Sequence, residues 1–268
     1  MRVKNKLFVV TGAGGGIGGE LTRVLIEKGA RVAAVDIDRD SLENLKQSLG
    51  RDNKILSAYP LDITDRKAVE QLPESIRNFQ GEVDGLINNA GIIQPFVKLK
   101  DLDFGVIERI MNINFYGTLN MLKTFLPLLL ERPEAHIVNV SSMGGFLPVP
   151  GQTVYCASKA AVKLLTEGLW GELRNTRVKV TVVFPGATET DIAKKSGVEV
   201  STQARGEQSK IPTLKPRVVA ELIVEGLERD RLYVFTGRDS NLMSLFYRIK
   251  PQFALNMITK QMGSLLTD

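Results

Sequence analysis

The sequence predicts an α/β protein whose core is a doubly wound parallel sheet of seven strands with helices on both faces. Short apolar runs, such as residues 7–10 and 31–35, have the length and composition of strands that are covered on both sides. Amphipathic helical stretches alternate with these runs, and right-handed crossovers of this kind build a parallel sheet. Glycine-rich or polar motifs follow most of the runs, at the carboxyl edge where such sheets bind ligands.

This alternation extends over residues 1–237, which we expect to form a single domain. The expected strands are residues 7–10, 31–35, 55–61, 83–87, 137–140, 178–184 and 232–236. The expected helices are a stretch after residue 18 and residues 40–49, 65–79, 103–130, 155–174 and 216–229. Two segments lie outside the pattern: residues 194–214, which are polar and irregular, and a C-terminal extension of residues 238–268.

The composition argues against several classes of protein. A net charge of +5 without blocks of like charge is weak support for nucleic-acid binding, and no nucleic-acid partner is expected. One cysteine cannot form an internal disulfide, which fits a reducing compartment, and one histidine leaves too few ligands for a zinc site. No signal-peptide pattern and no apolar window of ~20 residues is present. The sequence therefore predicts a cytoplasmic protein without a bound metal.

A glycine-rich turn follows the first expected strand and precedes a helix. Glycines let the backbone turn tightly and approach a pyrophosphate, whose charge is favoured at a helix N-terminus. A strand, such a turn and a helix form the context of a dinucleotide-binding fingerprint. The candidate cofactor contacts in the turn are Gly12, Gly14, Gly15, Gly16, Ile17 and Gly18.

The second expected strand ends on Asp36, in the range beyond the glycines that such a fingerprint requires. A carboxylate there accepts hydrogen bonds from a ribose diol and repels a 2′-phosphate. We therefore expect NAD(H) in preference to NADP(H). Arg39 could swing toward a 2′-phosphate and leaves NADP(H) as the alternative.

A tyrosine and a lysine lie four residues apart at the start of the fifth expected helix. Tyr155 and Lys159 would share one helix face, with about 5–6 Å between their Cβ atoms. A nearby cation favours the phenolate and lowers a phenol pKa below its reference of ~10. This pattern predicts that Tyr155 is a general acid/base.

Six motifs, in their order and spacing, resemble the classical short-chain dehydrogenase/reductase family. They are residues 11–18, 88–91 and 114–117, Ser142, the Tyr155–Lys159 pair, and Pro185-Gly186. The family's catalytic serine precedes its tyrosine by thirteen positions, which selects Ser142 over Ser141. The resemblance extends to about Gly237 and implies a Rossmann-type fold.

The resemblance implies reversible hydride transfer between NAD(H) and an alcohol or carbonyl substrate. Tyr155 would move the proton, Ser142 would bind the reacting oxygen, Lys159 would bind the nicotinamide ribose, and Asn114 would hold a relay water. NADP-binding relatives often have a basic residue at the positions of Gly15 and Ile37, which supports NAD(H) here. Further cofactor contacts are implied at Asp62, Ile63, Asn89, Ala90, Gly91, Pro185, Gly186, Thr188 and Thr190.

The family also implies a substrate lid and an assembly. The lid would be residues 194–214, whose polar, glycine-containing sequence suits a loop that orders on binding. Pairing through the helices at 103–130 and 155–174 would give a homodimer or homotetramer. Two other classes compete with the reductase. A sugar-nucleotide epimerase or dehydratase needs a longer C-terminal domain, and a dinucleotide-sensing regulator would be expected to have lost the tyrosine or the lysine.

The C-terminal extension is both apolar and basic. Leu242, Leu245, Phe246 and Ile249 have the spacing of an amphipathic helix, and a second apolar face can begin after Pro251. Three interpretations stay open: packing on the core or on a second subunit, a wall of a substrate site for lipid-like or steroid-like molecules, and peripheral contact with an anionic membrane.

Overall fold

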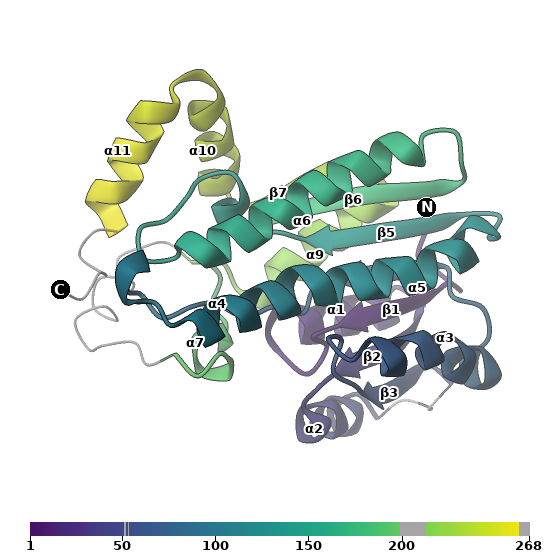
Figure 1. Ribbon diagram of the computed structural model, residues 1–268. Coiled ribbons are helices and arrows are strands. Elements are labelled where there is room, and N and C mark those ends of the chain that lie inside the picture. Colours follow the sequence, from purple (N-terminus) through teal and green to yellow (C-terminus); the bar gives the residue numbers. More distant parts are fainter. Residues whose placement is uncertain (51, 53, 199–212, 263–268) are drawn as a thin grey trace.

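The computed structural model describes residues 1–50, 52, 54–198 and 213–262. Seven parallel strands form one sheet in the order β3-β2-β1-β4-β5-β6-β7, as Figure 1 shows. The predicted doubly wound, Rossmann-type fold is thereby confirmed. The order of the strands reverses between β1 and β4, so the crevice of the topological switch point opens at the carboxyl ends of these two strands.

The elements have the following bounds. The strands are β1 (Leu7–Thr11), β2 (Arg31–Asp36), β3 (Leu56–Pro60), β4 (Gly85–Asn88), β5 (Ala135–Val140), β6 (Val178–Pro185) and β7 (Tyr233–Thr236). The helices are α1 (Gly16–Glu27), α2 (Arg39–Leu49), α3 (Arg66–Gln80), α4 (Phe104–Met111), α5 (Thr118–Leu130), α6 (Thr153–Glu172), α7 (Ile192–Lys195), α9 (Pro216–Glu228), α10 (Arg238–Ile249) and α11 (Pro251–Met262).

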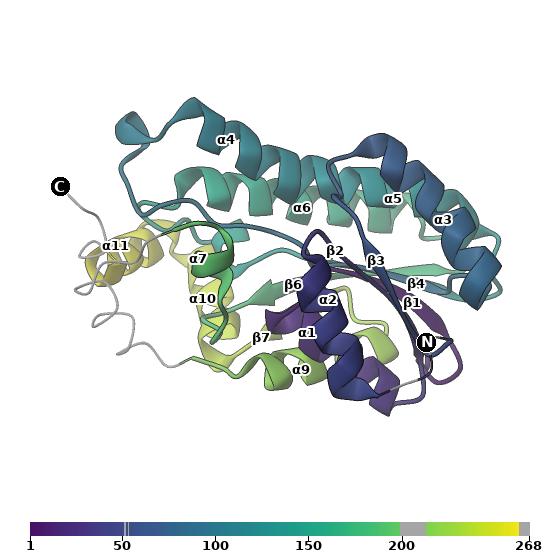
Figure 2. The same cartoon turned by 90° about the horizontal axis from the view of Figure 1, so that it is seen from below.

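Two helical layers cover the sheet. In Figure 2, α3, α4, α5 and α6 lie on one face, and α1, α2 and α9 lie on the other. Strand side chains alternate between the two cores: Leu7 and Val9 pack toward α3, α5 and α6, whereas Phe8 and Val10 pack toward α1, α2 and α9. Burial on both faces explains why the strands are almost continuously apolar.

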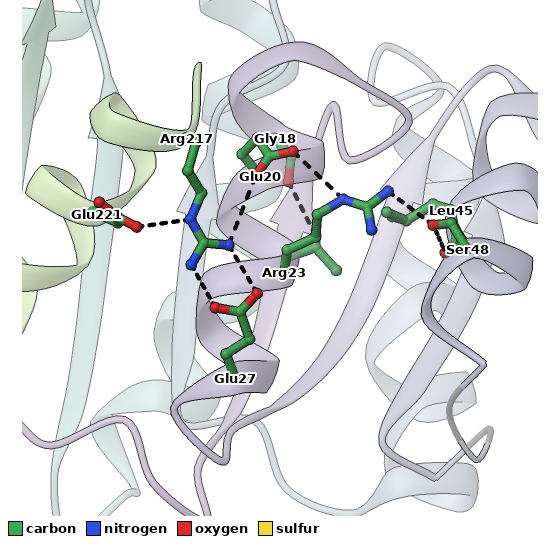
Figure 3. A network of polar contacts seen from close by, with 9 residues as sticks. Gly18, Glu20, Arg23, Glu27, Leu45, Ser48, Arg217 and Glu221 are labelled. Carbon is green, nitrogen blue, oxygen red and sulfur yellow. Dashed lines mark hydrogen bonds and ion pairs between the residues drawn. The ribbon is translucent and has the colours of Figure 1, made fainter. Parts of the chain in front are cut away.

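A cluster of charges joins the glycine-loop helix to α9. Arg217, near the start of α9, donates hydrogen bonds to Glu27 on α1 and to Glu221 one turn along its own helix (Figure 3). Glu20 on α1 lies 3.8 Å from the same guanidinium. Isolated surface ion pairs contribute little to stability, but several carboxylates on one arginine form a network with a defined geometry. The network fixes α1 beside the helix that follows the predicted lid.

The long helix predicted over residues 103–130 is interrupted. Helix α4 ends at Met111, a π-helical turn spans Asn112–Gly117, and α5 continues from Thr118. Single π-helical turns of this kind occur frequently at functional sites, because the extra residue re-aims side chains. The turn contains Asn114, one of the predicted catalytic residues.

The C-terminal extension forms two helices, and Pro251 begins the second of them. Met243, Tyr247, Ala254 and Ile258 face the protein and pack with Leu147 on the segment that follows Ser142. The stripe predicted from the sequence faces outward instead. Its side chains are largely exposed, at 54% for Leu242, 56% for Leu245, 39% for Phe246 and 66% for Ile249. Packing of this stripe on the chain's own core is therefore wrong, and the domain boundary near residue 237 stays a prediction.

None of the helices within the described ranges is both long and apolar enough to cross a membrane.

The single histidine is a structural residue at the far end of the sheet from the glycine loop. His136 on β5 is fully buried, and its Nε2 lies 2.8 Å from the Thr181 hydroxyl. Because that hydroxyl donates to the Arg231 carbonyl oxygen, Nε2 carries the imidazole proton. Nδ1 faces Asp230, which also binds the Met1 ammonium, and Glu134 is nearby. Burial lowers the pKa of His136 below its usual value, although Asp230 opposes the shift.

This lowered pKa predicts a loss of stability in mild acid. Between the lowered folded pKa and the ordinary value near ~6.5, the unfolded chain binds more protons than the folded chain. The free energy of unfolding should therefore fall as the pH drops below about 6.5, by at most about 1.4 kcal/mol per pH unit. Urea unfolding between pH 7 and pH 5 tests this. His136→Gln, which keeps a donor for Thr181, should flatten the decline, and a wild-type curve without a decline would contradict the assignment.

Candidate active site

A cavity of about 380 Å³ lies at the carboxyl edge of the sheet and opens to solvent. Its volume falls within the range of ligand pockets, and its lining runs from the glycine loop and the end of β2 to Tyr155. The predicted site residues on its lining are Gly12, Gly15, Gly16, Ile17, Asp36, Asp62, Ile63, Asn89, Ala90, Gly91, Ser142, Tyr155, Lys159, Pro185, Gly186, Thr188 and Thr190. Gly14, Gly18 and Asn114 stand behind this lining and act on it through contacts described below.

The glycine loop has the geometry that a pyrophosphate requires. Gly12 and Gly16 have φ angles of 67° and 55°, in the left-handed region that favours glycine. Helix α1 starts at Gly16 without a side-chain cap, so its first N–H groups have no partner within the helix. Gly15, Gly16 and Ile17 present this helix end to the cavity, where an anionic group fits both the N–H groups and the helix dipole.

The loop after β4 is tied to the end of β1. The Thr11 hydroxyl accepts from the backbone N–H groups of Asn89 (3.0 Å) and Ala90 (3.1 Å). The Asn89 amide in turn donates to the Thr11 carbonyl oxygen at 3.1 Å. Because β1 and β4 are adjacent at the switch point, these bonds hold the 88–91 motif against the glycine loop. The two motifs therefore form one wall of the cavity.

Asp36 ends β2 on the side of the cavity next to the glycine loop. Its carboxylate accepts from the backbone N–H of Gly14 at 2.8 Å and of Asp38 at 3.0 Å. A carboxylate has about four lone-pair positions, so these bonds leave acceptors for a ribose diol. Asp36 is thus aimed into the cavity where a ribose would meet the end of β2.

The structure brings Tyr155 and Ser142 together. The Ser142 hydroxyl accepts from the backbone N–H of Gly144 at 3.1 Å, and a Cβ at Gly144 would contact both this hydroxyl and the Tyr155 ring. Burial raises the pKa of Tyr155 to about 12, and the hydrogen bond from Ser142 opposes this shift only in part. Ser141 is occupied differently, because its hydroxyl donates to the Lys159 carbonyl oxygen at 2.7 Å. Only Ser142 of the two therefore reaches the phenol.

The expected lowering of the Tyr155 pKa by Lys159 is wrong for this state of the site. The Lys159 ammonium donates to the Val140 carbonyl oxygen at 3.0 Å, at the end of β5. Burial lowers the pKa of Lys159 to about 8, so the cation is itself disfavoured by its surroundings. Near pH 7 the site holds a protonated phenol beside a charged lysine, which is the arrangement of a proton donor.

Asn114 secures the main chain behind the lysine. Its amide accepts from the Ile92 N–H (2.8 Å) and donates to the Ile92 carbonyl oxygen (3.0 Å) and to the Ser158 hydroxyl (2.9 Å). Gly91 lies between Asn114 and Lys159: a Cβ there would lie 3.1 Å from the Asn114 Oδ1 and 3.0 Å from the Lys159 Nζ. Asn114 thus joins the loop after β4 to α6.

Gln94, which the sequence did not single out, caps the helix that contains Tyr155. Its Oε1 accepts from the backbone N–H groups of Val154 (2.9 Å) and Tyr155 (3.0 Å), and its Nε2 donates to the Gly151 carbonyl oxygen (2.8 Å). The residue is fully buried, and α6 has no cap from its own Gln152 side chain. A cap from 61 residues upstream has no local signal in the sequence, because capping motifs are read between neighbours.

The predicted lid is described only at its two ends. Residues 199–212 lie outside the described residues. At the N-terminal end, Lys195 of α7 reaches the glycine loop, where its Nζ donates to the Gly14 carbonyl oxygen at 3.3 Å. At the C-terminal end, Leu214 pairs with Thr188 in a single parallel bridge. Both ends of the segment therefore meet the cofactor side of the cavity. Within the described residues no cluster of acidic, histidine or cysteine side chains could hold a metal ion.

Comparisons with known proteins agree with this site. Residues 6–200 match the protein family described as short chain dehydrogenase. A protein of Mycobacterium tuberculosis (strain ATCC 25618 / H37Rv) called SadH, which is named as an oxidoreductase, is 35% identical over 255 residues. That match covers 92% of this chain and 91% of the relative.

Solved structures with the same fold contain either cofactor. A short chain dehydrogenase/reductase from Burkholderia phymatum in complex with NAD has a TM-score of 0.85 at 24% identity, over 94% of this chain and 96% of that chain. A short chain dehydrogenase from Burkholderia cenocepacia J2315 in complex with NADP has a TM-score of 0.80 at 26% identity, over 96% of this chain and 99% of that chain.

Proposed function

The chain belongs to the short chain dehydrogenase family of NAD(P)-dependent oxidoreductases, and from this premise we propose that it transfers a hydride between NAD(H) and a lipophilic alcohol or carbonyl compound. The observation that carries the proposal is the presence of Ser142, Tyr155 and Lys159 together on the lining of the cavity that the glycine loop and Asp36 also line. The glycine loop would hold the pyrophosphate, Asp36 the adenosine ribose, and Lys159 the nicotinamide ribose.

The side chains divide the proton chemistry between them. The bound nicotinamide supplies or accepts the hydride. In carbonyl reduction, the Tyr155 hydroxyl donates its proton to the developing alkoxide, and Ser142 hydrogen-bonds the same oxygen. The Lys159 ammonium would stabilise the phenolate that remains, Asn114 would hold the main chain of Ile92 behind the lysine, and a proton from solvent water would restore the phenol. With a Tyr155 pKa of about 12, the phenol is protonated near pH 7 and can serve as the acid in carbonyl reduction.

Asp36 supports a preference for NAD(H). Its carboxylate would meet a 2′-phosphate at the end of β2, where like charges repel. Arg39, the residue considered as an alternative contact for NADP(H), is not among the residues that line the cavity. A reductase that prefers NADP(H) is the alternative, and the NADP complex of a similar chain keeps it open.

The C-terminal helices support a lipophilic substrate. Ala254 and Ile258 of α11 pack with Leu147, Phe146 and Met143, which belong to the segment between Ser142 and Tyr155. None of these side chains is on the lining of the cavity itself, so the proposed wall would lie next to the cavity, where apolar side chains would favour hydrocarbon over polar groups. The outward stripe of α10 would bring the protein to membranes, where lipophilic substrates collect. Leu245 and Ile249 are flanked by Arg248 and Lys250, the arrangement of a helix that lies on an anionic membrane surface.

A homo-oligomer is also part of the proposal. Large apolar side chains are exposed on the layer of α4, α5 and α6, which run side by side in Figures 1 and 2. They are Phe104, Leu130, Leu164 and Trp170. Exposed apolar side chains on neighbouring helices mark a contact surface, and a two-fold symmetric pairing of this layer would bury them in a dimer or a tetramer.

Removal of the Tyr155 hydroxyl tests the chemistry. Tyr155→Phe should lower kcat for a panel of carbonyl compounds by at least about 10²-fold, because a general acid contributes a factor of about 10²–10⁴. The dissociation constant for NADH, measured by fluorescence titration, should change little. Tyr116→Phe, on an exposed side chain, is the matched control. Turnover by Tyr155→Phe at near the wild-type rate would exclude the proposed mechanism.

Changes on the two faces of the C-terminal helices should have different effects: the inner face should determine the preference for long substrates, and the outer face should determine membrane binding. Truncation after Gly237 should remove both a rise of kcat/KM with substrate chain length and flotation with anionic vesicles. Leu245→Asp with Ile249→Asp, on the outer face, should abolish flotation and leave the chain-length profile unchanged. A folded truncated enzyme with the wild-type chain-length profile would refute the substrate wall. Equal flotation of the double variant would refute the membrane contact.

Light scattering tests the assembly. At micromolar concentration the protein should have the mass of two or four chains, and Leu164→Glu should shift it toward the monomer because a charge would be buried at the contact. Phe79→Glu, on an exposed side chain of α3, is the control. A wild-type protein that is only monomeric would contradict the proposal.

A further inference from the structure

One residue of the glycine loop, Gly14, links two opposite charges. The backbone N–H of Gly14 donates to Asp36 at 2.8 Å, and its carbonyl oxygen accepts from the Lys195 ammonium at 3.3 Å. Asp36 ends β2, whereas Lys195 is the last residue of α7, which follows β6. Both side chains line the cavity. A carboxylate and a cation therefore flank the same turn, on the side where the adenosine ribose is expected.

The end of the lysine side chain lies close to the backbone of Gly15. A Cβ at position 15 would lie 2.9 Å from the Lys195 Nζ and 3.6 Å from its Cε. The lysine stem therefore lies directly against the backbone of Gly15. Lys195 thus supplies a positive charge over the loop at a position where Gly15 itself has no side chain.

The ammonium lies toward the end of β2. The pKa of Asp38 is lowered, chiefly by the hydrogen bond from the Ser41 hydroxyl, and the charge of Lys195 adds to the shift. Asp38 follows Asp36 by two residues, so the charge acts on the segment that contacts the ribose. The partner on the loop is the Gly14 carbonyl oxygen, which is not one of the N–H groups that face a pyrophosphate at the start of α1.

We propose that Lys195 binds the 2′-phosphate of NADP(H), so that Asp36 and Lys195 read the 2′ position of the ribose with opposite charges. This inference rests on the proposed dinucleotide-dependent function and refines its cofactor choice. Asp36 favours the ribose diol of NAD(H) over the 2′-phosphate of NADP(H). Lys195 reduces this preference for NAD(H), so that NADP(H) is still bound.

Lys195 can leave the Gly14 carbonyl oxygen for a phosphate at a small cost in free energy. At 3.3 Å and exposed to solvent, the bond from Lys195 to the Gly14 carbonyl oxygen is weak. A phosphate with two negative charges forms a charge-assisted hydrogen bond, which is roughly twice as strong as a neutral one. Four flexible methylene groups let the ammonium move toward the phosphate without displacing α7.

Lys194 provides a matched control. It precedes Lys195 on α7, has the same charge and is exposed, but it is not among the residues that line the cavity. A change of general surface potential would affect both lysines alike, whereas a direct contact would affect Lys195 alone.

Calorimetric titration of the purified protein at low ionic strength tests the inference with four probes: NADPH, NADH, 2′,5′-ADP and 5′-ADP. Lys195→Gln should weaken the binding of NADPH and 2′,5′-ADP by about tenfold or more, since it removes a hydrogen bond between two charged groups. NADH and 5′-ADP, which lack the 2′-phosphate, should change less than about twofold, and added salt should shrink the effect on NADPH. Lys194→Gln should change none of the four, and Lys195→Arg should retain most of the NADPH affinity.

The outcomes separate this inference from the proposed function. Equal weakening of NADH and NADPH by Lys195→Gln would place the lysine on the pyrophosphate and overturn the inference. The inference would also be overturned if Lys194→Gln weakened NADPH binding as much as Lys195→Gln does. It would be overturned as well if Lys195→Gln left the NADPH affinity unchanged. In all three cases, NADH binding by the wild type would leave the proposed function standing. Failure to bind either dinucleotide would overturn both.

Discussion

The close approach of Gly12, Gly18 and Ala90 is the constraint on which the rest of the site depends. A Cβ at position 18 would lie 2.0 Å from the Gly12 carbonyl oxygen, and one at position 12 would lie 2.9 Å from the Ala90 Cα. Because no side chain separates them, helix α1 begins directly against the ends of β1 and β4. The uncapped N–H groups of α1 and the 88–91 loop therefore open on one cavity, and Asp36 reaches it from the neighbouring strand.

Main-chain partners hold the side chains of the candidate site in place. The ammonium of Lys159 is bound to a carbonyl oxygen of β5, and Asn114 binds both main-chain groups of Ile92. Gln94 accepts hydrogen bonds from two backbone N–H groups in the first turn of α6. These contacts connect segments that lie far apart in the sequence, and they depend on the fold rather than on a bound ligand. Such contacts pre-organise the positions of the reacting groups, which is how a site limits the reorganisation needed for reaction.

The sequence predicts those parts of the structure that follow from local pattern. Strand ends such as Asp36 and Ser142 could be placed because each closes an apolar run, and parallel strands bring their carboxyl ends to one edge. The π-helical turn at Asn114 and the cap from Gln94 could not, because both depend on tertiary contacts. The prediction that Lys159 lowers the Tyr155 pKa was wrong for a related reason. Helical spacing predicts a nearby cation, but it does not show that Lys159 is bound to Val140 and that the phenol is buried.

The outward stripe on α10 shows a different limit of sequence patterns. An apolar period of 3.6 residues identifies a helix face, but it does not say what covers that face. Here Ser240 and Ser244 are buried against the protein, whereas Leu245 and Ile249 face outward. Helix α10 therefore places these serines and the half-buried Met243 on the fold and turns its leucine and isoleucine toward solvent. The packed face contributes hydrophobic free energy on folding, whereas the exposed leucine and isoleucine contribute none until a partner covers them. The apolar face thus points to contact with something beyond this chain's own core.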